Sequence, residues 1–268
     1  MVLLVFIPVL LFMGFQLYEN YYANNIMLFQ FINGLTPGPD WLWQNITFLG
    51  DGLPAFIVLV FFLRKFPSIL WYGLVISVVT GVCLHTLKQL VFLARPAAIL
   101  GIENIRVIGP ALYHHSFPSG HSLTAFSVAA LFIHLTKGRY QIALLLLASL
   151  ISWSRVVVGA HWPSDVIIGA LLGWYGAKLA IILAETRWRW GMDSSRGALS
   201  LKLFAMAGGI YLWWYAETYQ YALVPARTLS VIACWHLLQI LLDQFPAAMP
   251  GKYLPLFNRR PTKSTEAQ

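Results

Sequence analysis

Long runs of apolar residues alternate with short polar segments along almost the whole chain. Eight runs are long enough to cross, or nearly cross, a hydrocarbon core of ~30 Å. They lie at about residues 2–19, 53–65, 69–93, 119–136, 140–158, 163–185, 201–216 and 222–243. A shorter run, Asn25 to Leu35, contains asparagine and is predicted to lie in the membrane interface. The pattern predicts an all-α, polytopic transmembrane helical bundle.

The composition supports this class and excludes others. Only 10% of the residues are charged and 59% are hydrophobic, whereas a soluble domain has about 25% charged residues. The net charge of +8 does not indicate nucleic acid, because no basic stripe lies on a soluble face. Cys83 and Cys234 fall inside apolar runs, where a small hydrophobic role is expected. The predicted partner is therefore the bilayer, and the sequence carries no signal of oligomeric state.

The basic residues predict the orientation. The first run lacks the basic start and cleavage site of a signal peptide, so we expect it to remain as a span. With a cytoplasmic N-terminus, the positive-inside rule is obeyed by twelve of the 18 basic residues. These are Arg64, Lys65, Lys137, Arg139, Arg187, Arg189, Arg196, Lys202, Lys252, Arg259, Arg260 and Lys263.

The polar stretch HHSFPSGHS, residues 114–122, holds three of the seven histidines and starts the fourth apolar run. Ser119, Gly120 and His121 are predicted to open a helix on the non-cytoplasmic side. A helix start offers unpaired backbone N–H groups, and glycine lets an anion approach the main chain. This stretch therefore predicts an anion-binding site.

Two cations precede this stretch on the same predicted face. Lys88 and Arg95 are seven residues apart, close to two helical turns, so we expect both on one side of a helix that Pro96 ends or turns. Arginine can donate two bonds to a phosphate and lysine supplies a point charge. Either cation alone is also compatible with an interfacial side chain that reaches toward water.

A third polar group follows in SRVVVGAHWPSD, residues 154–165. Arg155 lies near the outer end of the fifth run, and Pro163 suits the first turn of the next helix. Asp165 follows His161 by four residues, so its carboxylate can reach back to the imidazole. A histidine held in this way keeps one nitrogen available for attack.

These three groups resemble the signature of the type 2 phosphatidic acid phosphatase (PAP2) superfamily. The matching positions are Lys88-x6-Arg95-Pro96, Pro118-Ser119-Gly120-His121 and Ser154-Arg155-x5-His161-x3-Asp165. The resemblance implies a six-helix catalytic membrane domain over residues 1–185. Residues 186–268 would add a cytoplasmic loop, two further transmembrane helices and a basic cytoplasmic tail.

The resemblance also implies roles for the site residues. His161 would attack phosphorus to form a phosphohistidine, Asp165 would orient it, and His121 would protonate the leaving oxygen. The phosphoryl oxygens would be held by Lys88, Arg95, Ser119, Gly120 and Arg155. No metal or other cofactor is implied. His114 and His115 match no fixed family position and are interpreted as loop residues or head-group contacts.

The expected function is a metal-independent lipid phosphate phosphatase. Phosphatidic acid, phosphatidylglycerol phosphate, a polyprenyl diphosphate and a phosphorylated lipid A would all present a suitable phosphoryl group. The compact chain is typical of a bacterial inner (plasma) membrane enzyme, with its site on the periplasmic or extracellular side. Two alternatives stay open: a lipid-to-lipid phosphotransferase with the same site, and a transporter of an anionic lipid.

Overall fold

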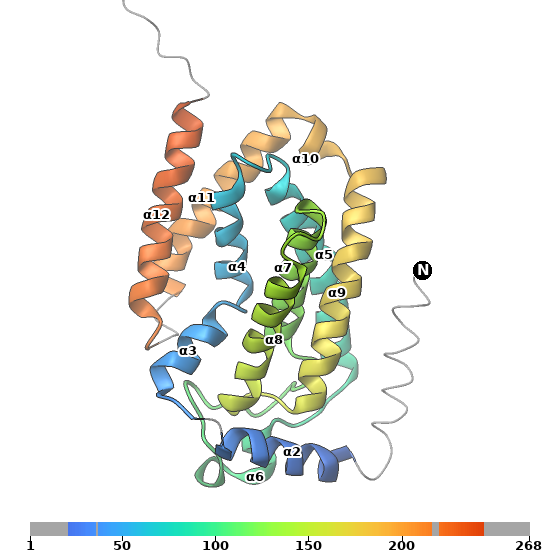
Figure 1. The fold of residues 1–268 in the computed structure, drawn as a ribbon, viewed down its shortest axis with the longest axis vertical. Helices are drawn as coiled ribbons and strands as arrows, with labels where there is room; N and C mark the ends of the chain where they lie inside the picture. The colour runs from blue at the N-terminus through green and yellow to red at the C-terminus, as the bar shows by residue number, and fades with distance from the viewer. Residues whose placement is uncertain (1–20, 36, 216–219, 244–268) are drawn as a thin grey trace, which may run out of the picture.

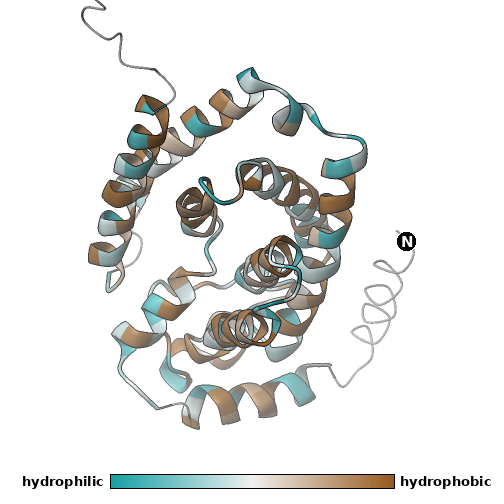
Figure 2. Cartoon of the chain, turned by 45° about the horizontal axis from the view of Figure 1, so that its top comes forward, coloured by the Kyte–Doolittle hydropathy of each residue, from teal (hydrophilic) through white to brown (hydrophobic). Residues whose placement is uncertain are grey.

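The described part of the chain is a bundle of helices without strands (Figure 1). The structure is a computed structural model that describes residues 21–35, 37–215 and 220–243. The first predicted span, residues 2–19, lies outside the described residues. Large hydrophobic residues are exposed on the helices as well as buried in the interior. Figure 2 shows hydrophobic residues along most of the helices. This distribution suits a bundle surrounded by lipid, and the predicted all-α membrane class is confirmed.

Four helices form the centre of the bundle. They are α5 (Ile69–Leu90), α7 (Gly120–Leu135), α8 (Gln141–Val157) and α9 (Pro163–Thr186), and α7 packs against the other three. Their starts carry local signals: Ser119 is the N-cap of α7, and Pro163 occupies the first turn of α9. Both helix starts were predicted from these residues.

Two glycines of α9 permit the closest helix contact in this centre. A Cβ on Gly169 would collide with the Ser119 carbonyl oxygen, and one on Gly173 would collide with the Leu123 carbonyl oxygen. Glycine is the residue that allows backbones to approach so closely in membrane helix pairs. The contact brings the starts of α7 and α9 together at one end of the bundle.

The segment before this centre is bent and partly crosswise. Figure 1 shows α2 (Tyr21–Leu35) lying across the lower end of the bundle. Its position in the membrane interface stays a prediction. α3 (Asp40–Phe48) meets α4 (Gly52–Val58) and the 3-10 turn η1 (Leu59–Phe62) at an angle of 67°. Asp51 caps α4 by accepting a hydrogen bond from the Leu53 N–H at 3.2 Å.

Lys88 and Arg95 do not share a helix, contrary to the sequence-based prediction. α5 ends at Leu90, and residues 91–95 are not helical. Pro96 disfavours a helical conformation for Arg95, whose φ of −82° and ψ of 164° are extended. Pro96 instead opens the short helix α6 (Pro96–Leu100), which is followed by the 3-10 turn η2 (Ile102–Asn104).

The C-terminal part is a helical hairpin beside α4. After α10 (Trp190–Asp193), α11 (Ser195–Tyr215) and α12 (Leu223–Leu242) pack on each other and on α4. α11 begins six residues earlier than the predicted run at 201 because polar Ser195 and Arg196 are already helical. The predicted run 222–243 corresponds to α12.

Not every predicted run forms a helix long enough to cross a membrane. Among the described residues, α5, α9 and α12 are long and apolar enough to cross a membrane, and α3 with α4–η1 qualifies as one bent pair. α7 and α8 are apolar but shorter. The chain is an integral membrane protein, while the count of eight spans stays a prediction.

Candidate active site

His161 lies in the loop between α8 and α9, between a carboxylate and a guanidinium group. Its Nδ1 is 3.4 Å from Asp165 Oδ2, and its Nε2 is 3.3 Å from Arg95 Nη1. The side chain is almost fully buried. Since the carboxylate faces Nδ1, Nε2 is the nitrogen that faces the cations. The structure thus brings Asp165 back to His161 as the four-residue spacing predicted.

Two donors fix the Asp165 carboxylate. Ser116 Oγ donates to Oδ2 at 2.6 Å, and the Trp162 backbone N–H donates to the same oxygen at 3.0 Å. The carboxylate is completely buried. Ser116 was not a predicted site residue, because the motif has no fixed position for it and only the fold places it against Asp165.

The Arg95 guanidinium group contacts three backbone carbonyl groups of the loops around His161. Its Nε donates to the His114 carbonyl at 2.8 Å, and its Nη1 donates to the Ala160 carbonyl at 2.9 Å. Its Nη2 lies 3.4 Å from the His115 carbonyl. A guanidinium group can hold several acceptors in one plane. Arg95 therefore joins the loop before α7 to the loop that carries His161.

Lys88 reaches the same loop from the end of α5. Its Nζ donates to the His115 carbonyl at 2.7 Å, while His115 Nδ1 lies 3.0 Å from the Lys88 carbonyl. His114 and His115 thus act through their carbonyl groups, which position the two cations. This finding agrees with the interpretation of these histidines as loop residues, and it explains how two cations from different elements meet.

Arg155 approaches from the end of α8. Its Nη1 donates to Thr47 Oγ1 at 2.5 Å, which links α8 to α3. The Arg155 carbonyl accepts the backbone N–H groups of Ala160 at 3.1 Å and His161 at 3.2 Å. These two bonds close the turn that presents His161.

The start of α7 lies beside the start of α9. The Ser119 N–H donates to the Asp165 carbonyl at 3.0 Å, and Ser119 Oγ accepts from Ser122 Oγ at 3.1 Å. The Ser119 side chain is therefore engaged in capping α7, and it is completely buried. Gly120 and His121 follow as the first helical residues, so all eight predicted site residues lie at one end of the bundle.

Positive charge and burial act together on His161. Burial lowers the pKa of His161 well below its ordinary value of 6.5, and Arg95, Arg155 and Lys88 lower it further. The imidazole is therefore neutral at pH 7. A neutral imidazole beside three cations can attack an electrophile that carries negative charge, such as a phosphoryl group.

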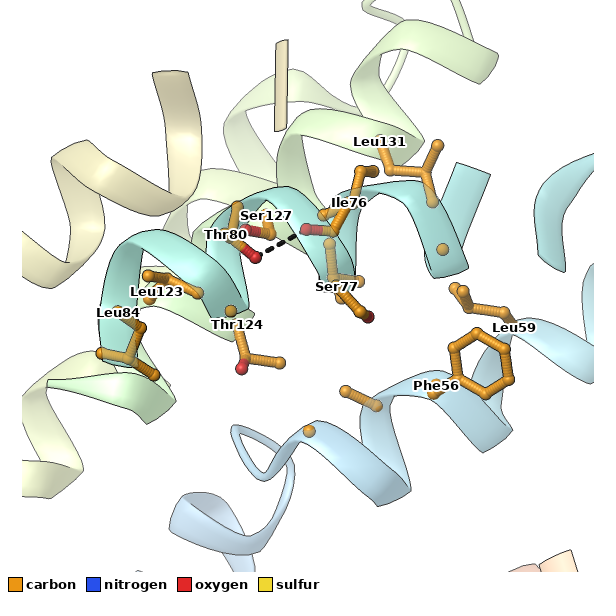
Figure 3. Close-up of a pocket in the computed structure, with 15 residues that line it drawn as sticks. Phe56, Leu59, Ile76, Ser77, Thr80, Leu84, Leu123, Thr124, Ser127 and Leu131 are labelled. Atoms are coloured by element: carbon orange, nitrogen blue, oxygen red, sulfur yellow. Dashed lines mark hydrogen bonds between the residues drawn. The ribbon is translucent and has the colours of Figure 1, made fainter. Parts of the chain in front are cut away.

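Two cavities adjoin this cluster. The polar chamber, of about 210 Å³, is lined by His121 and Arg155 together with Gln44, Thr47, Gly109 and Tyr215. The apolar cavity, of about 170 Å³, lies between α4, α5 and α7 and is lined by Phe56, Leu59, Ile76, Leu84, Leu123 and Leu131, among others (Figure 3). In the described part of the chain, no three His, Cys, Asp or Glu side chains gather to hold a metal ion.

Comparison with known proteins now decides the family. The family model for the PAP2 superfamily matches residues 68–189. The putative undecaprenyl-diphosphatase YbjG of Escherichia coli K12 is 30% identical, over 59% of this chain and 82% of that protein. This chain belongs to the PAP2 superfamily. The matched region contains all three parts of the motif.

Other PAP2 relatives differ in their names and coverage. A lipid A 1-phosphatase of Rhizobium etli is 37% identical over 40% of this chain and 47% of that protein. A second, from Rhizobium johnstonii, is 33% identical over 54% of its length. The chain thus spans about half the length of these two curated relatives.

A solved structure shares most of the bundle. The crystal structure of Aquifex aeolicus LpxE has a TM-score of 0.54 and 31% sequence identity, and covers 62% of this chain and 99% of that chain. The rest of this chain, including the α11–α12 hairpin beyond the matched residues 68–189, adds to what the PAP2 family model describes.

Proposed function

We propose that this PAP2 protein is a metal-independent phosphatase that releases phosphate from a lipid phosphate or diphosphate. The observation that carries the proposal is the position of His161, whose Nδ1 faces Asp165 at 3.4 Å and whose Nε2 faces Arg95 at 3.3 Å. A nucleophile oriented by a carboxylate and directed at a cationic pocket suits phosphoryl transfer.

The reaction has two steps. His161 Nε2 attacks phosphorus, the bond to the leaving oxygen breaks, and His121 donates a proton to that oxygen, so that a phosphohistidine forms. Water then attacks the phosphohistidine, His121 accepts a proton from it, and phosphate leaves. Asp165 accepts hydrogen bonds from Ser116 and Trp162, so it is held in place to support the positive imidazole.

The cations hold and neutralise the transferred group. Lys88, Arg95 and Arg155 come from three different elements, and each is oriented by a bond to a carbonyl or hydroxyl oxygen. Such preorganised charge stabilises the transition state without further rearrangement. The N–H groups at the start of α7, at Gly120, add the positive end of a helix dipole.

The substrate is proposed to be a lipid because the apolar cavity begins beside the site. Leu84 lines this cavity, and a Cβ on Gly120 would lie 3.3 Å from Leu84 Cδ2. An apolar chain placed there would extend from the reacting phosphate toward the middle of the bundle. With the N-terminus cytoplasmic, the site faces the periplasm or the exterior, and the host membrane is the bacterial inner membrane.

Phosphate release by detergent-purified protein tests the function. The panel contains phosphatidic acid, phosphatidylglycerol phosphate, a polyprenyl diphosphate and lipid A, with EDTA in every assay. We expect release from at least one class, and complete loss in His161→Ala. The matched control is His85→Ala, because His85 is exposed on the outer face of α5.

The possible results separate the alternatives. Release that persists in His161→Ala would contradict the nucleophile, and release abolished by EDTA would contradict the metal-free mechanism. No free phosphate, with labelled phosphate appearing on a second lipid, would indicate the phosphotransferase. Lipid movement across vesicles that survives His161→Ala would indicate the transporter.

If the apolar cavity holds the lipid chain, filling it should reduce activity on long-chain substrates. Ser77→Phe places a large ring in the wall of the cavity, where Ser77 points inward in Figure 3. We expect kcat/KM for a long-chain substrate to fall about tenfold, with a smaller loss for a short-chain analogue of the same head group. Val78→Phe is the control, since Val78 is 48% exposed and does not line the cavity.

A further inference from the structure

The polar chamber beside His121 has walls from inside and outside the matched PAP2 region. Arg155 and Gly109 come from within residues 68–189, whereas Gln44 and Thr47 come from α3, and Tyr215 comes from the end of α11. The α11–α12 hairpin therefore reaches back to the active-site end of the bundle.

Hydrogen bonds hold the hairpin in this place. Tyr215 Oη donates to Asp51 Oδ2 at 2.7 Å, and Asp51 also caps α4. The Tyr221 N–H donates to Gln44 Oε1, and Asn45 Nδ2 donates to the Tyr221 carbonyl at 3.2 Å. The bend between α3 and α4 is thus joined to both sides of the hairpin loop.

The bond from Tyr221 also decides how Gln44 is oriented. A backbone N–H can only donate, so the Gln44 oxygen faces Tyr221 and its NH2 group faces the other way. That nitrogen lies against Gly109, where an added Cβ would be 3.3 Å from it, and Gly109 has a φ of +91° that favours glycine. Both residues line the chamber. Gln44 therefore presents donors at the chamber wall.

The chamber lining combines hydrogen-bond donors with apolar residues such as Val107, Ile108 and Leu112. The Gln44 amide, the Thr47 hydroxyl and the Arg155 guanidinium line it together. The group that such walls recognise carries several acceptor oxygens. His121, which stands at the leaving oxygen in the proposed mechanism, lines the same chamber. The recognised oxygens therefore belong to the leaving part of the substrate.

We propose that the polar chamber is a head-group subsite, in which Gln44 and Tyr215 select substrates whose leaving group is rich in oxygen next to the scissile phosphate. A second phosphoryl group and a sugar ring share this chemistry. Gln44 donates to these oxygens, and Tyr215 bounds the chamber while its hydroxyl holds Asp51. The inference rests on the proposed phosphatase function and deepens it by naming a substrate class.

Kinetic selectivity tests this subsite. The substrates are farnesyl monophosphate, farnesyl diphosphate and a lipid-linked glucosamine 1-phosphate, and the readout is the ratio of kcat/KM between each oxygen-rich substrate and the monophosphate. The full-length variants are Gln44→Met, Gln44→Glu and Tyr215→Phe. Gln44→Glu keeps the acceptor for the Tyr221 N–H while it removes the donor.

We expect both Gln44 variants to lower the ratio about tenfold, the size of one hydrogen bond, and Tyr215→Phe to lower it about threefold. The control is Tyr211→Phe, because Tyr211 lies one turn earlier, is 60% exposed and does not line the chamber. It should leave the ratio unchanged. A fall for the diphosphate alone would identify the second phosphoryl group as the occupant, and a fall for the sugar phosphate alone would identify the sugar.

Two results would overturn the inference. An equal loss on all three substrates would mean that Gln44 and Tyr215 only support the fold, and an unchanged ratio in the Gln44 variants would mean that the chamber does not contact the leaving group. An inactive wild-type protein would instead contradict the phosphatase function itself, and this result differs from an active protein with an unchanged ratio.

Discussion

The α7–α9 pair and the α11–α12 pair are both close helix contacts, but they differ in what meets at the contact. In α7–α9, Gly169 and Gly173 face the carbonyl oxygens of Ser119 and Leu123. In α11–α12, a Cβ on Gly209 would meet Cys234 Sγ at 2.8 Å, a side-chain atom. A side chain can rotate away, whereas a carbonyl in a helix cannot. The first pair therefore tolerates less change, and it is the pair that carries the site.

The second difference is exposure. Large side chains of the hairpin, such as Trp214 at 60% and Trp235 at 61%, face outward, while Asp165 and Ser119 at the start of α9 and α7 are completely buried. The hairpin adds one wall of the polar chamber, and the central helices position the groups proposed to react. Changes in the two regions should consequently affect different properties of the protein.

After His161→Ala, the largest effect is expected at Asp165. Asp165→Asn retains the volume but removes the charge that supports the imidazolium and alters the bonds from Ser116 and Trp162. We expect kcat to fall on the order of 10⁴-fold, as for the orienting carboxylate of other catalytic histidines. Phosphate-release kinetics measure this, with Asp193→Asn, which changes an exposed carboxylate outside the site, as the control. An active Asp165→Asn protein would show that Asp165 has no orienting role.

Two glycine-to-alanine variants, one in α9 and one in α11, compare how well the two helix contacts accept an added methyl group. Gly173→Ala would force the Leu123 carbonyl to move, so we expect a loss of about 1–3 kcal/mol in the free energy of unfolding. Gly208→Ala in α11 meets only side-chain ends, Ile57 Cδ1 at 3.3 Å and Leu53 Cδ1 at 3.5 Å, and alanine favours helix. It should change stability by less than about 1 kcal/mol. Thermal unfolding in detergent compares them, and equal losses would contradict the distinction.

The pH dependence of kcat/KM reports on His161. Attack requires the neutral imidazole, and burial with the nearby cations lowers its pKa, so activity is kept at pH 6.5 and lost only as the pH falls through that lowered pKa. Arg95→Gln removes one positive charge, which raises the pKa and moves the acid limb to higher pH. Tyr211→Phe in the hairpin should leave the pH of the acid limb of the kcat/KM profile unchanged. An acid limb above pH 6.5 in the wild type would contradict this environment.

The smallest effect is expected where the hairpin meets the opposite end of the bundle. Arg64 Nη2 and Asp243 Oδ2 are 2.9 Å apart, but their side chains are 58% and 68% exposed. Exposed pairs contribute about 0–1 kcal/mol because solvent screens them. Asp243→Asn should therefore leave both the unfolding midpoint and phosphate release almost unchanged. A marked loss of either would show that this pair anchors the hairpin.

Much of the fold and the site follows from local sequence. The apolar runs predict the helices because lipid requires every backbone group to be bonded within its own segment. Ser119 and Pro163 predict where α7 and α9 begin, since capping and a fixed φ act within one turn. The four-residue spacing of His161 and Asp165 likewise predicts their meeting across that helix start.

Other features were decided only by the tertiary structure. Arg95 and Lys88 do not share a helix but donate to neighbouring carbonyl groups of the loop before α7. Ser116 donates a hydrogen bond to Asp165, and Tyr215 lines the chamber from the end of α11. Each of these contacts joins residues far apart in the chain, so no periodicity or cap could predict it. The Ser116–Asp165 contact also depends on how closely α7 and α9 approach, and two glycines whose partners are backbone atoms of another helix permit that approach.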